Sequence, residues 1–172
     1  SNLRTQSDPP AVIAVVIGSA TAFAGNDRKL PIYCVETEKK QIAISFDAAW
    51  GNDDTQMLID ILKEYNVPAT FFVVGSWGDK YPESVKALSD AGHQVQNHSN
   101  THPHMPQLSK QQMRDELESC NSKIKAITGV CPTLLRPPYG DYDNALIETV
   151  DSINMKTIQW SVDSLDWKDS AT

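Results

Sequence analysis

The stretch PATFFVVG, from Pro68 to Gly75, is a continuous apolar run of the kind that forms a parallel strand buried on both faces. Four further strand-type runs occur along the chain, at residues 41–47, 93–99, 133–137 and 156–163. Helix-type periodicity separates them, at residues 57–65, 82–92, 109–129 and 144–153. Because strands that alternate with helices form right-handed βαβ units, the pattern predicts an α/β fold around a parallel sheet.

Length and composition restrict the classes of function. The chain has 172 residues, of which 40% are hydrophobic and 22% charged, which predicts one folded domain. Its formal net charge of −7 makes nucleic acid and membrane surfaces poor partners. Neither a G-x-G-x-x-G nor a G-x-x-x-x-G-K-[ST] loop occurs, so nucleotide-dependent chemistry has no support. A serine hydrolase has no support either, because the sequence has no G-x-S-x-G motif. The oligomeric state does not follow from the sequence.

Residues 1–40 form an N-terminal segment ahead of the first expected strand. Within it, residues 11–24 are apolar and end in Ala22-Phe23-Ala24, the A-x-A form of a signal-peptidase site. One interpretation is export, or a remnant of a membrane anchor. The other is an ordinary buried or docked segment, because a basic region before the run is missing and the run is shorter than the ~20 residues that span a bilayer.

Reactive side chains follow the strand ends, where ligands bind in every parallel α/β design. They are Asp47, His98, His102, Arg136, Asp163 and Asp166. We therefore expect an active site at the edge of the sheet where the carboxyl ends of the strands lie. Five strands are fewer than the eight of a full (β/α)₈ barrel. An open sheet, a small distorted barrel and a truncated barrel all remain compatible with this pattern.

The spacing of His98 and His102 lets two imidazoles reach one cation, and nitrogen with oxygen ligands fits zinc, cobalt, nickel or iron better than calcium or magnesium. The alternative is a pair of surface or capping histidines. Asp47, at the end of an apolar strand, would be partly desolvated and suited to a general base, or else would cap a turn. Arg136, beside two prolines, would hold that base in place, and a backbone N–H near Tyr139 would face an oxyanion. The alternative for Arg136 is a simple salt bridge at a turn.

Three tryptophans allow two interpretations. Trp77, Trp160 and Trp167 could line a sugar-stacking cleft, although aromatic residues of an α/β protein more often pack in the core.

Four short motifs resemble those of the polysaccharide deacetylases of the NodB-homology type, carbohydrate esterase family 4. Ser45–Ala48 (SFDA) is similar to T-F-D-D, His98–His102 (HSNTH) to H-[ST]-x-x-x-H, Arg136–Tyr139 (RPPY) to R-x-P-[YF], and Asp166-Trp167 to D-W. Residues 30–33 and 46–51 look like the sporulation-type and membrane-anchored bacterial members, which act on peptidoglycan.

The resemblance implies a fold, a reaction and a location. The fold is an irregular (β/α) barrel, here residues 41–172, and the reaction is metal-assisted hydrolysis of N-acetyl groups on amino sugars of a cell-wall polysaccharide. The resemblance assigns catalysis to Asp47, Arg136 and Asp166, substrate binding to Tyr139 and Trp167, and a divalent metal, zinc first, to His98 and His102. An extracellular or cell-wall-facing location follows from such a substrate.

Two departures from the family pattern keep other functions open. Ala48 stands where the family has a second Asp, usually a metal ligand, so a third ligand would come from Asp47, Asp53, Asp54 or water. No L-x-H motif with its acid histidine follows Trp167, and we expect the last strand–helix unit to be missing. The alternatives are a non-catalytic glycan-binding homologue and another barrel-type metal hydrolase such as a phosphoesterase.

Overall fold

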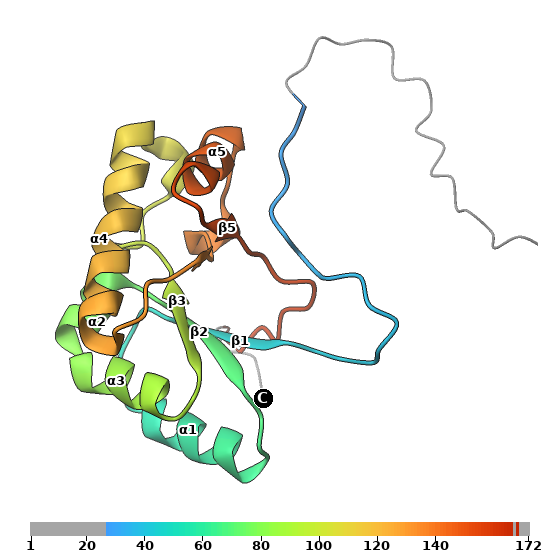
Figure 1. The fold of residues 1–172 in the computed structure, drawn as a ribbon, viewed down its shortest axis with the longest axis vertical. Coiled ribbons are helices and arrows are strands. Elements are labelled where there is room, and N and C mark those ends of the chain that lie inside the picture. Colours follow the sequence, from blue (N-terminus) through green and yellow to red (C-terminus); the bar gives the residue numbers. More distant parts are fainter. Residues whose placement is uncertain (1–26, 167, 169–172) are drawn as a thin grey trace, which may run out of the picture.

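The computed structural model describes residues 27–166 and 168, and these form one parallel sheet with helices packed against it (Figure 1). The strands are β1 Ile44–Ala48, β2 Ala69–Val73, β3 Gln94–Asn97, β4 Leu134–Leu135 and β5 Lys156–Thr157, paired in the order β1-β2-β3-β4-β5. All four pairings are parallel, which confirms the predicted α/β fold. The strands follow one another in sequence order, as they do in a (β/α) barrel. The sheet is not closed within the described residues, so β1 is an edge strand.

Five α-helices connect or flank the strands. They are α1 Thr55–Glu64, α2 Gly75–Lys80, α3 Pro82–Asp90, α4 Lys110–Thr128 and α5 Asn144–Ser152, with short 3₁₀ turns at Met105–Gln107 and Pro138–Gly140. Figure 1 shows α1 to α4 along one side of the sheet and the segment that precedes β1 on the other. The longest helix, α4, begins and ends as predicted: Ser109 and Gln112 form a reciprocal capping box, and Gly129 follows with φ 79°.

Two features of the predicted elements are wrong. The strand expected at 68–75 ends at Val73, and the helix α2, which lies outside the predicted helices, begins at Gly75. Gly75 lies so close to Asn100 that a Cβ there would be 2.5 Å from the Asn100 Oδ1, and its N–H donates to the Ser99 carbonyl at 2.9 Å. The strand expected at 156–163 pairs only as far as Ile158, because its partner β4 has two residues.

The core has two parts, and β2 contributes to both faces of the sheet as its apolar sequence predicts. Phe71 and Val73 pack with Val85, Leu88 and other residues of the helices in the first part. Phe72 points to the opposite face, where it is fully buried beneath the guanidinium of Arg136. The second part lies between α4, α5 and β4 and consists of Met105, Met113, Leu117, Leu135, Leu146, Val150 and Met155.

The segment before β1 docks on the far edge of the sheet. Ile32 forms a parallel bridge with Ile158: its N–H donates to the Thr157 carbonyl and its carbonyl accepts from Gln159, both at 2.8 Å. Residues 11–24, for which export, an anchor or a docked segment were expected, lie outside the described residues. Among the described helices, none combines the length and apolarity that a membrane crossing requires.

Candidate active site

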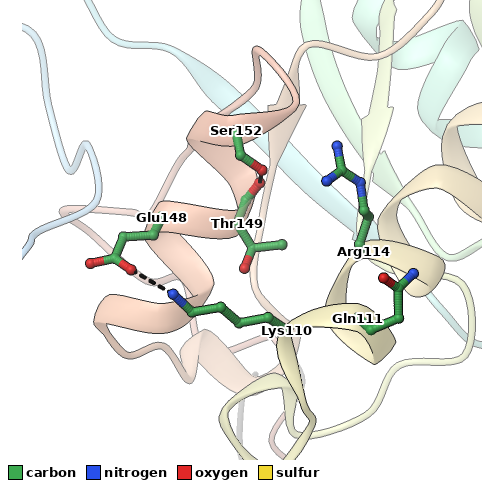
Figure 2. Close-up of a pocket in the computed structure, with 6 residues that line it drawn as sticks. All are labelled: Lys110, Gln111, Arg114, Glu148, Thr149 and Ser152. Carbon is green, nitrogen blue, oxygen red and sulfur yellow. Dashed lines mark hydrogen bonds and ion pairs between the residues drawn. The ribbon is translucent and has the colours of Figure 1, made fainter.

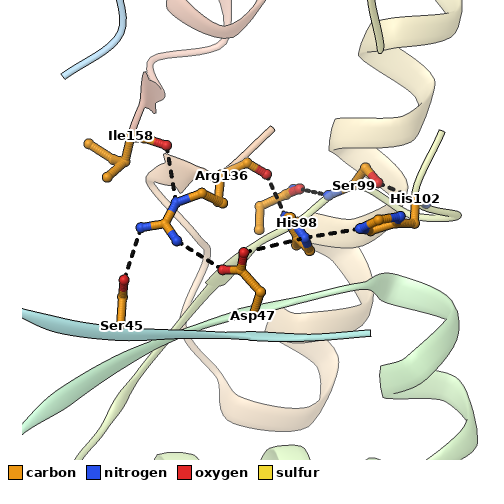
Figure 3. A network of polar contacts seen from close by, with 8 residues as sticks. Ser45, Asp47, His98, Ser99, His102, Arg136 and Ile158 are labelled. Atoms are coloured by element: carbon orange, nitrogen blue, oxygen red, sulfur yellow. Dashed lines mark hydrogen bonds and ion pairs between the residues drawn. The ribbon is translucent and has the colours of Figure 1, made fainter. Parts of the chain in front are cut away.

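Four of the predicted site residues meet at the carboxyl ends of the strands, as expected for a parallel sheet (Figure 3). Asp47 belongs to β1, His98 follows β3 directly, and Arg136 follows β4 directly. His102 comes from the loop after β3. The convergence predicted from the sequence is therefore present for these four residues, while their roles stay predictions.

Arg136 connects β1, β4 and the chain after β5. Its Nη1 lies 3.0 Å from the Asp47 Oδ1, its Nη2 donates to the Ser45 Oγ at 2.9 Å, and its Nε donates to the Ile158 carbonyl at 3.3 Å. The side chain is only 6% exposed and lies over the Phe72 ring. Burial lowers the pKa of Arg136, and the neighbouring Asp47 charge opposes that shift. A guanidinium remains cationic in such a setting, so Asp47 has a fixed positive partner.

Asp47 is partly exposed. Its side chain is 37% exposed, in line with the partial desolvation expected at the end of an apolar strand. It stays open to solvent because β1 is the edge strand of the described sheet, so nothing pairs with it on one side. Asp47 can therefore reach both Arg136 and a ligand in solvent.

His98 is buried and held in one tautomer. Its Nδ1 lies 2.6 Å from the backbone carbonyl of Arg136, an acceptor only, so Nδ1 must carry the proton. The Nε2 lone pair then points into the site, 3.2 Å from the Nε2 of His102 and 3.8 Å from the Asp47 Oδ2. A carbonyl that fixes a ring in this way is a common support of metal-binding histidines.

The loop that carries His102 is strained and firmly anchored. Ser99 and His102 have φ angles of 67° and 62°, a region that residues other than glycine seldom adopt. The Asn97 side chain accepts from the Ser99 N–H at 2.7 Å, and the Ser99 Oγ accepts from the His102 N–H at 2.9 Å. The Glu116 carboxylate of α4 accepts from the N–H groups of Asn100 and Thr101, both at 2.8 Å. Sequence reasoning missed Asn97 and Glu116, because neither belongs to a recognisable motif.

The two imidazoles have the chemistry of a metal-binding pair. Burial lowers the pKa of both His98 and His102, which leaves both neutral with lone pairs available at neutral pH. Two nitrogens bound tetrahedrally to zinc at ~2.0–2.1 Å are about 3.3 Å apart, close to the 3.2 Å between these Nε2 atoms. The buried His102 Nδ1 has no hydrogen-bond partner among the described residues.

A complete ligand set is missing. Within residues 27–166 and 168, no group of three or more His, Cys, Asp or Glu side chains is placed to hold a metal ion. Neither Asp53 nor Asp54, two of the alternative third ligands, completes such a group. Ala48 packs beside the first core cluster and offers no donor atom. Among the described residues, His98 and His102 could supply two ligands to a divalent cation, and the remaining positions would fall to solvent.

A tight turn after Arg136 brings aromatic rings to the site. Tyr139 has φ 60°, is 59% exposed, stacks on His104 at 4.0 Å and meets the edge of His102 at 4.6 Å between ring centroids. The turn is held from behind, since Gln159 donates to the Gly140 carbonyl at 2.7 Å and Trp160 packs against Gly140. This strained backbone is where an oxyanion-facing N–H was expected.

The remaining predicted residues have other surroundings. Asp166 is exposed and accepts a hydrogen bond from the Ser164 Oγ at 2.8 Å, with no ion pair to Arg136 in the described part of the chain. Trp167 lies outside the described residues. The prediction that Trp77 lines a cleft is wrong, because that side chain is buried in the first core cluster. The centroid of the Trp160 ring lies 5.3 Å from the Cζ atom of Arg136.

Surface cavities occur elsewhere. One of about 200 Å³ lies between α4 and α5 and is lined by Lys110, Gln111, Arg114, Glu148, Thr149 and Ser152 (Figure 2). It contains none of the four clustered residues. Within the cluster, Arg136 and His98 are buried, and Asp47 is 37% exposed and can be reached from solvent.

A parallel sheet that carries a carboxylate, a guanidinium and two imidazoles at the carboxyl ends of its strands defines an α/β protein with a hydrolase-like centre. The chain belongs to the polysaccharide deacetylase family, whose model matches residues 35–158.

Curated relatives carry names from the same family. The peptidoglycan-N-acetylmuramic acid deacetylase PdaA of Bacillus subtilis is 36% identical over 137 residues, which are 79% of this chain and 52% of that protein. A peptidoglycan-N-acetylglucosamine deacetylase of Bacillus cereus is 30% identical over 151 residues, 88% of this chain and 55% of that protein. The chain thus spans about half the length of these relatives.

Solved structures confirm the fold. A carbohydrate esterase family 4 pseudoenzyme from Bacillus anthracis is 37% identical with a TM-score of 0.78, over 80% of this chain and 49% of that one. A mutant of that pseudoenzyme is described as having restored enzymatic activity; it is 38% identical, with the same TM-score of 0.78, over 80% of this chain and 51% of that one. The predicted NodB-type α/β architecture is therefore confirmed, with the barrel open in the described residues.

Proposed function

We propose that this chain hydrolyses N-acetyl groups from amino sugars of a cell-wall polysaccharide, with peptidoglycan as the first candidate. The observation that supports the proposal is the Arg136–Asp47–His98–His102 cluster on an open rim of a polysaccharide deacetylase fold. The names of the relatives from Bacillus subtilis and Bacillus cereus support peptidoglycan as the substrate. Such a substrate would place the chain on the outer, cell-wall side of the membrane.

His98 and His102 would hold a divalent cation, zinc before cobalt, nickel or iron, which supplies a Lewis acid for the weakly electrophilic amide carbonyl. Asp47 takes the proton from the attacking water, and the hydrogen bond from Arg136 holds the carboxylate in position for that transfer. The strained turn at Tyr139 presents backbone N–H to the developing oxyanion.

The proton then has to reach the leaving nitrogen, because an amine leaves poorly unless it is protonated. Asp47 has received one proton from water and is partly exposed to the substrate side, so it can return that proton to the nitrogen. The carbon–nitrogen bond breaks, and acetate and a free amino sugar result. Asp166 and Trp167 stay as predictions for catalysis and substrate binding.

A second candidate function is glycan binding without hydrolysis. It is favoured by Ala48, by the lack of a three-ligand group within the part of the chain that the structure describes, and by the pseudoenzyme among the similar structures. In that case the same rim would bind saccharide, and the water would never be activated.

The test is acetate release from chitotetraose and from peptidoglycan, with zinc supplied and with the Asp47→Asn variant beside the wild type. Hydrolysis predicts acetate from the wild type and a loss of at least about 100-fold in Asp47→Asn, since a positioned general base contributes 10²–10⁴-fold. Saccharide binding without any acetate would overturn hydrolysis and establish the second candidate.

A further inference from the structure

Trp50 is a large aromatic side chain that is mostly exposed to solvent at the rim of the site. It lies in the loop directly after β1, three residues after Asp47, and is 81% exposed. Its ring contacts the His102 imidazole in an edge-to-face arrangement, with 5.8 Å between centroids. Exposed tryptophans are uncommon on protein surfaces, and at interfaces they are among the residues that contribute most to binding.

The backbone under Trp50 is fixed. The carbonyl of Gly51 accepts a hydrogen bond from the buried Trp77 Nε1 at 2.5 Å, and the Asn52 side chain donates to the Ser84 Oγ at 3.1 Å. Gly51 has φ 54°, a conformation that favours glycine. The loop that carries the exposed indole is therefore anchored by its neighbours, so little loop entropy is lost when a ligand binds there.

Two exposed rings contact the same imidazole. Trp50 approaches His102 from the loop after β1, and Tyr139 approaches it from the turn after β4 at 4.6 Å. His104 stacks on Tyr139 at 4.0 Å and is held by Asp141, whose Oδ2 lies 3.2 Å from the His104 Nδ1. The cluster of Asp47, His98 and His102 is therefore bordered by aromatic rings on two loops.

We propose that Trp50 is a stacking platform for one pyranose ring of the glycan, adjacent to the sugar whose acetamido group lies at Asp47 and His102. A sugar ring has an apolar C–H face and polar edges, which matches an indole with one N–H donor. A ring stacked on Trp50 lies directly beside His102, so the platform selects oligosaccharides over single sugars. The inference rests on the proposed glycan substrate and adds a residue that determines its length.

The experiment is titration calorimetry with chitotetraose and with the monosaccharide N-acetylglucosamine, on the full 172-residue chain. The variants are Trp50→Ala, the conservative Trp50→Phe, and Tyr65→Ala as the matched control, because Tyr65 is 70% exposed at the C-terminal end of α1. We expect Trp50→Ala to weaken chitotetraose binding by about tenfold or more and to remove most of the gain over the monosaccharide. Trp50→Phe should stay within about threefold of the wild type, and Tyr65→Ala should be unchanged.

The outcomes separate the two proposals. Equal chitotetraose binding by wild type and Trp50→Ala overturns the platform, whether or not acetate is released. If chitotetraose binding depends on Trp50 but no acetate is released, the role of Trp50 as a stacking platform is supported and hydrolysis is overturned. If the wild type binds no chitotetraose, the platform is overturned as well.

Discussion

Replacing Arg136 by methionine removes the side chain that connects three parts of the sheet. The guanidinium is almost fully buried, forms an ion pair with Asp47, and donates hydrogen bonds to two neutral acceptors, the Ser45 Oγ and the Ile158 carbonyl. Methionine keeps much of the volume over Phe72 but none of these bonds. Arg136→Lys is the informative companion, because it keeps the charge but lacks the planar fork that reaches several acceptors.

The expected loss of stability follows from the unequal burial of the ion pair. Arg136 is 6% exposed and Asp47 is 37% exposed, so the pair lies between a surface pair, about 0–1 kcal/mol, and a broken buried pair, about 3–5 kcal/mol. The two hydrogen bonds to neutral acceptors add about 1.5 kcal/mol each, and relief from burying the cation offsets a large part of the sum. We expect Arg136→Met to lower the free energy of unfolding by about 1–3 kcal/mol, and Arg136→Lys by less.

The assay is urea unfolding at pH 7 followed by tryptophan fluorescence, together with acetate release. Both variants should lose about 100-fold in acetate release, because a misplaced base is costly even when charge is kept. Arg114→Met is the control: its pair with Glu118 on α4 is exposed, and we expect a change below about 0.5 kcal/mol. If Arg136→Met unfolds like the wild type and releases acetate at the same rate, the role given to this residue is refuted.

Three other changes test separate parts of the molecule. Ala48→Asp should add a carboxylate next to Asp47 and raise zinc affinity about tenfold or more, measured by competition with a chelator; unchanged affinity would contradict the assignment of the missing ligand. Glu116→Gln should loosen the loop of His102 and lower zinc affinity by about 10–100-fold while the unfolding midpoint moves little; a large fall in stability with unchanged zinc binding would show a purely structural role. Burial raises the pKa of the Cys120 thiol to about 12, from 9.0, so above pH 9 the unfolded state loses its proton first. The wild type should then lose about 1.4 kcal/mol per pH unit relative to Cys120→Ala, and parallel pH profiles of the two proteins would disprove this.

The sequence predicts the sheet well because β2 is apolar on both faces, and parallel strands place their ends on one rim. The meeting of Asp47, His98 and Arg136 follows from that geometry alone. The sequence does not predict α2. A six-residue helix with two glycines, GSWGDK, has little periodicity and depends on close contact with Asn100.

The parts of the site that could not be predicted depend on contacts distant in sequence. Glu116 supports the His102 loop from the middle of α4, where one more acidic residue on a polar face gives no signal. The exposure of Asp47 depends on β1 being an edge strand, which periodicity does not reveal. Trp50 was missed because an aromatic residue in an α/β sequence is more often buried, as Trp77 is.

The most direct measurement is calorimetric titration of zinc into the wild type and into a His98→Ala, His102→Ala double variant at pH 7.5, where both imidazoles are neutral. We expect one zinc ion per wild-type chain and no binding by the double variant. A wild type that binds no zinc, or a double variant that binds it equally well, would contradict a metal centre built on these two histidines.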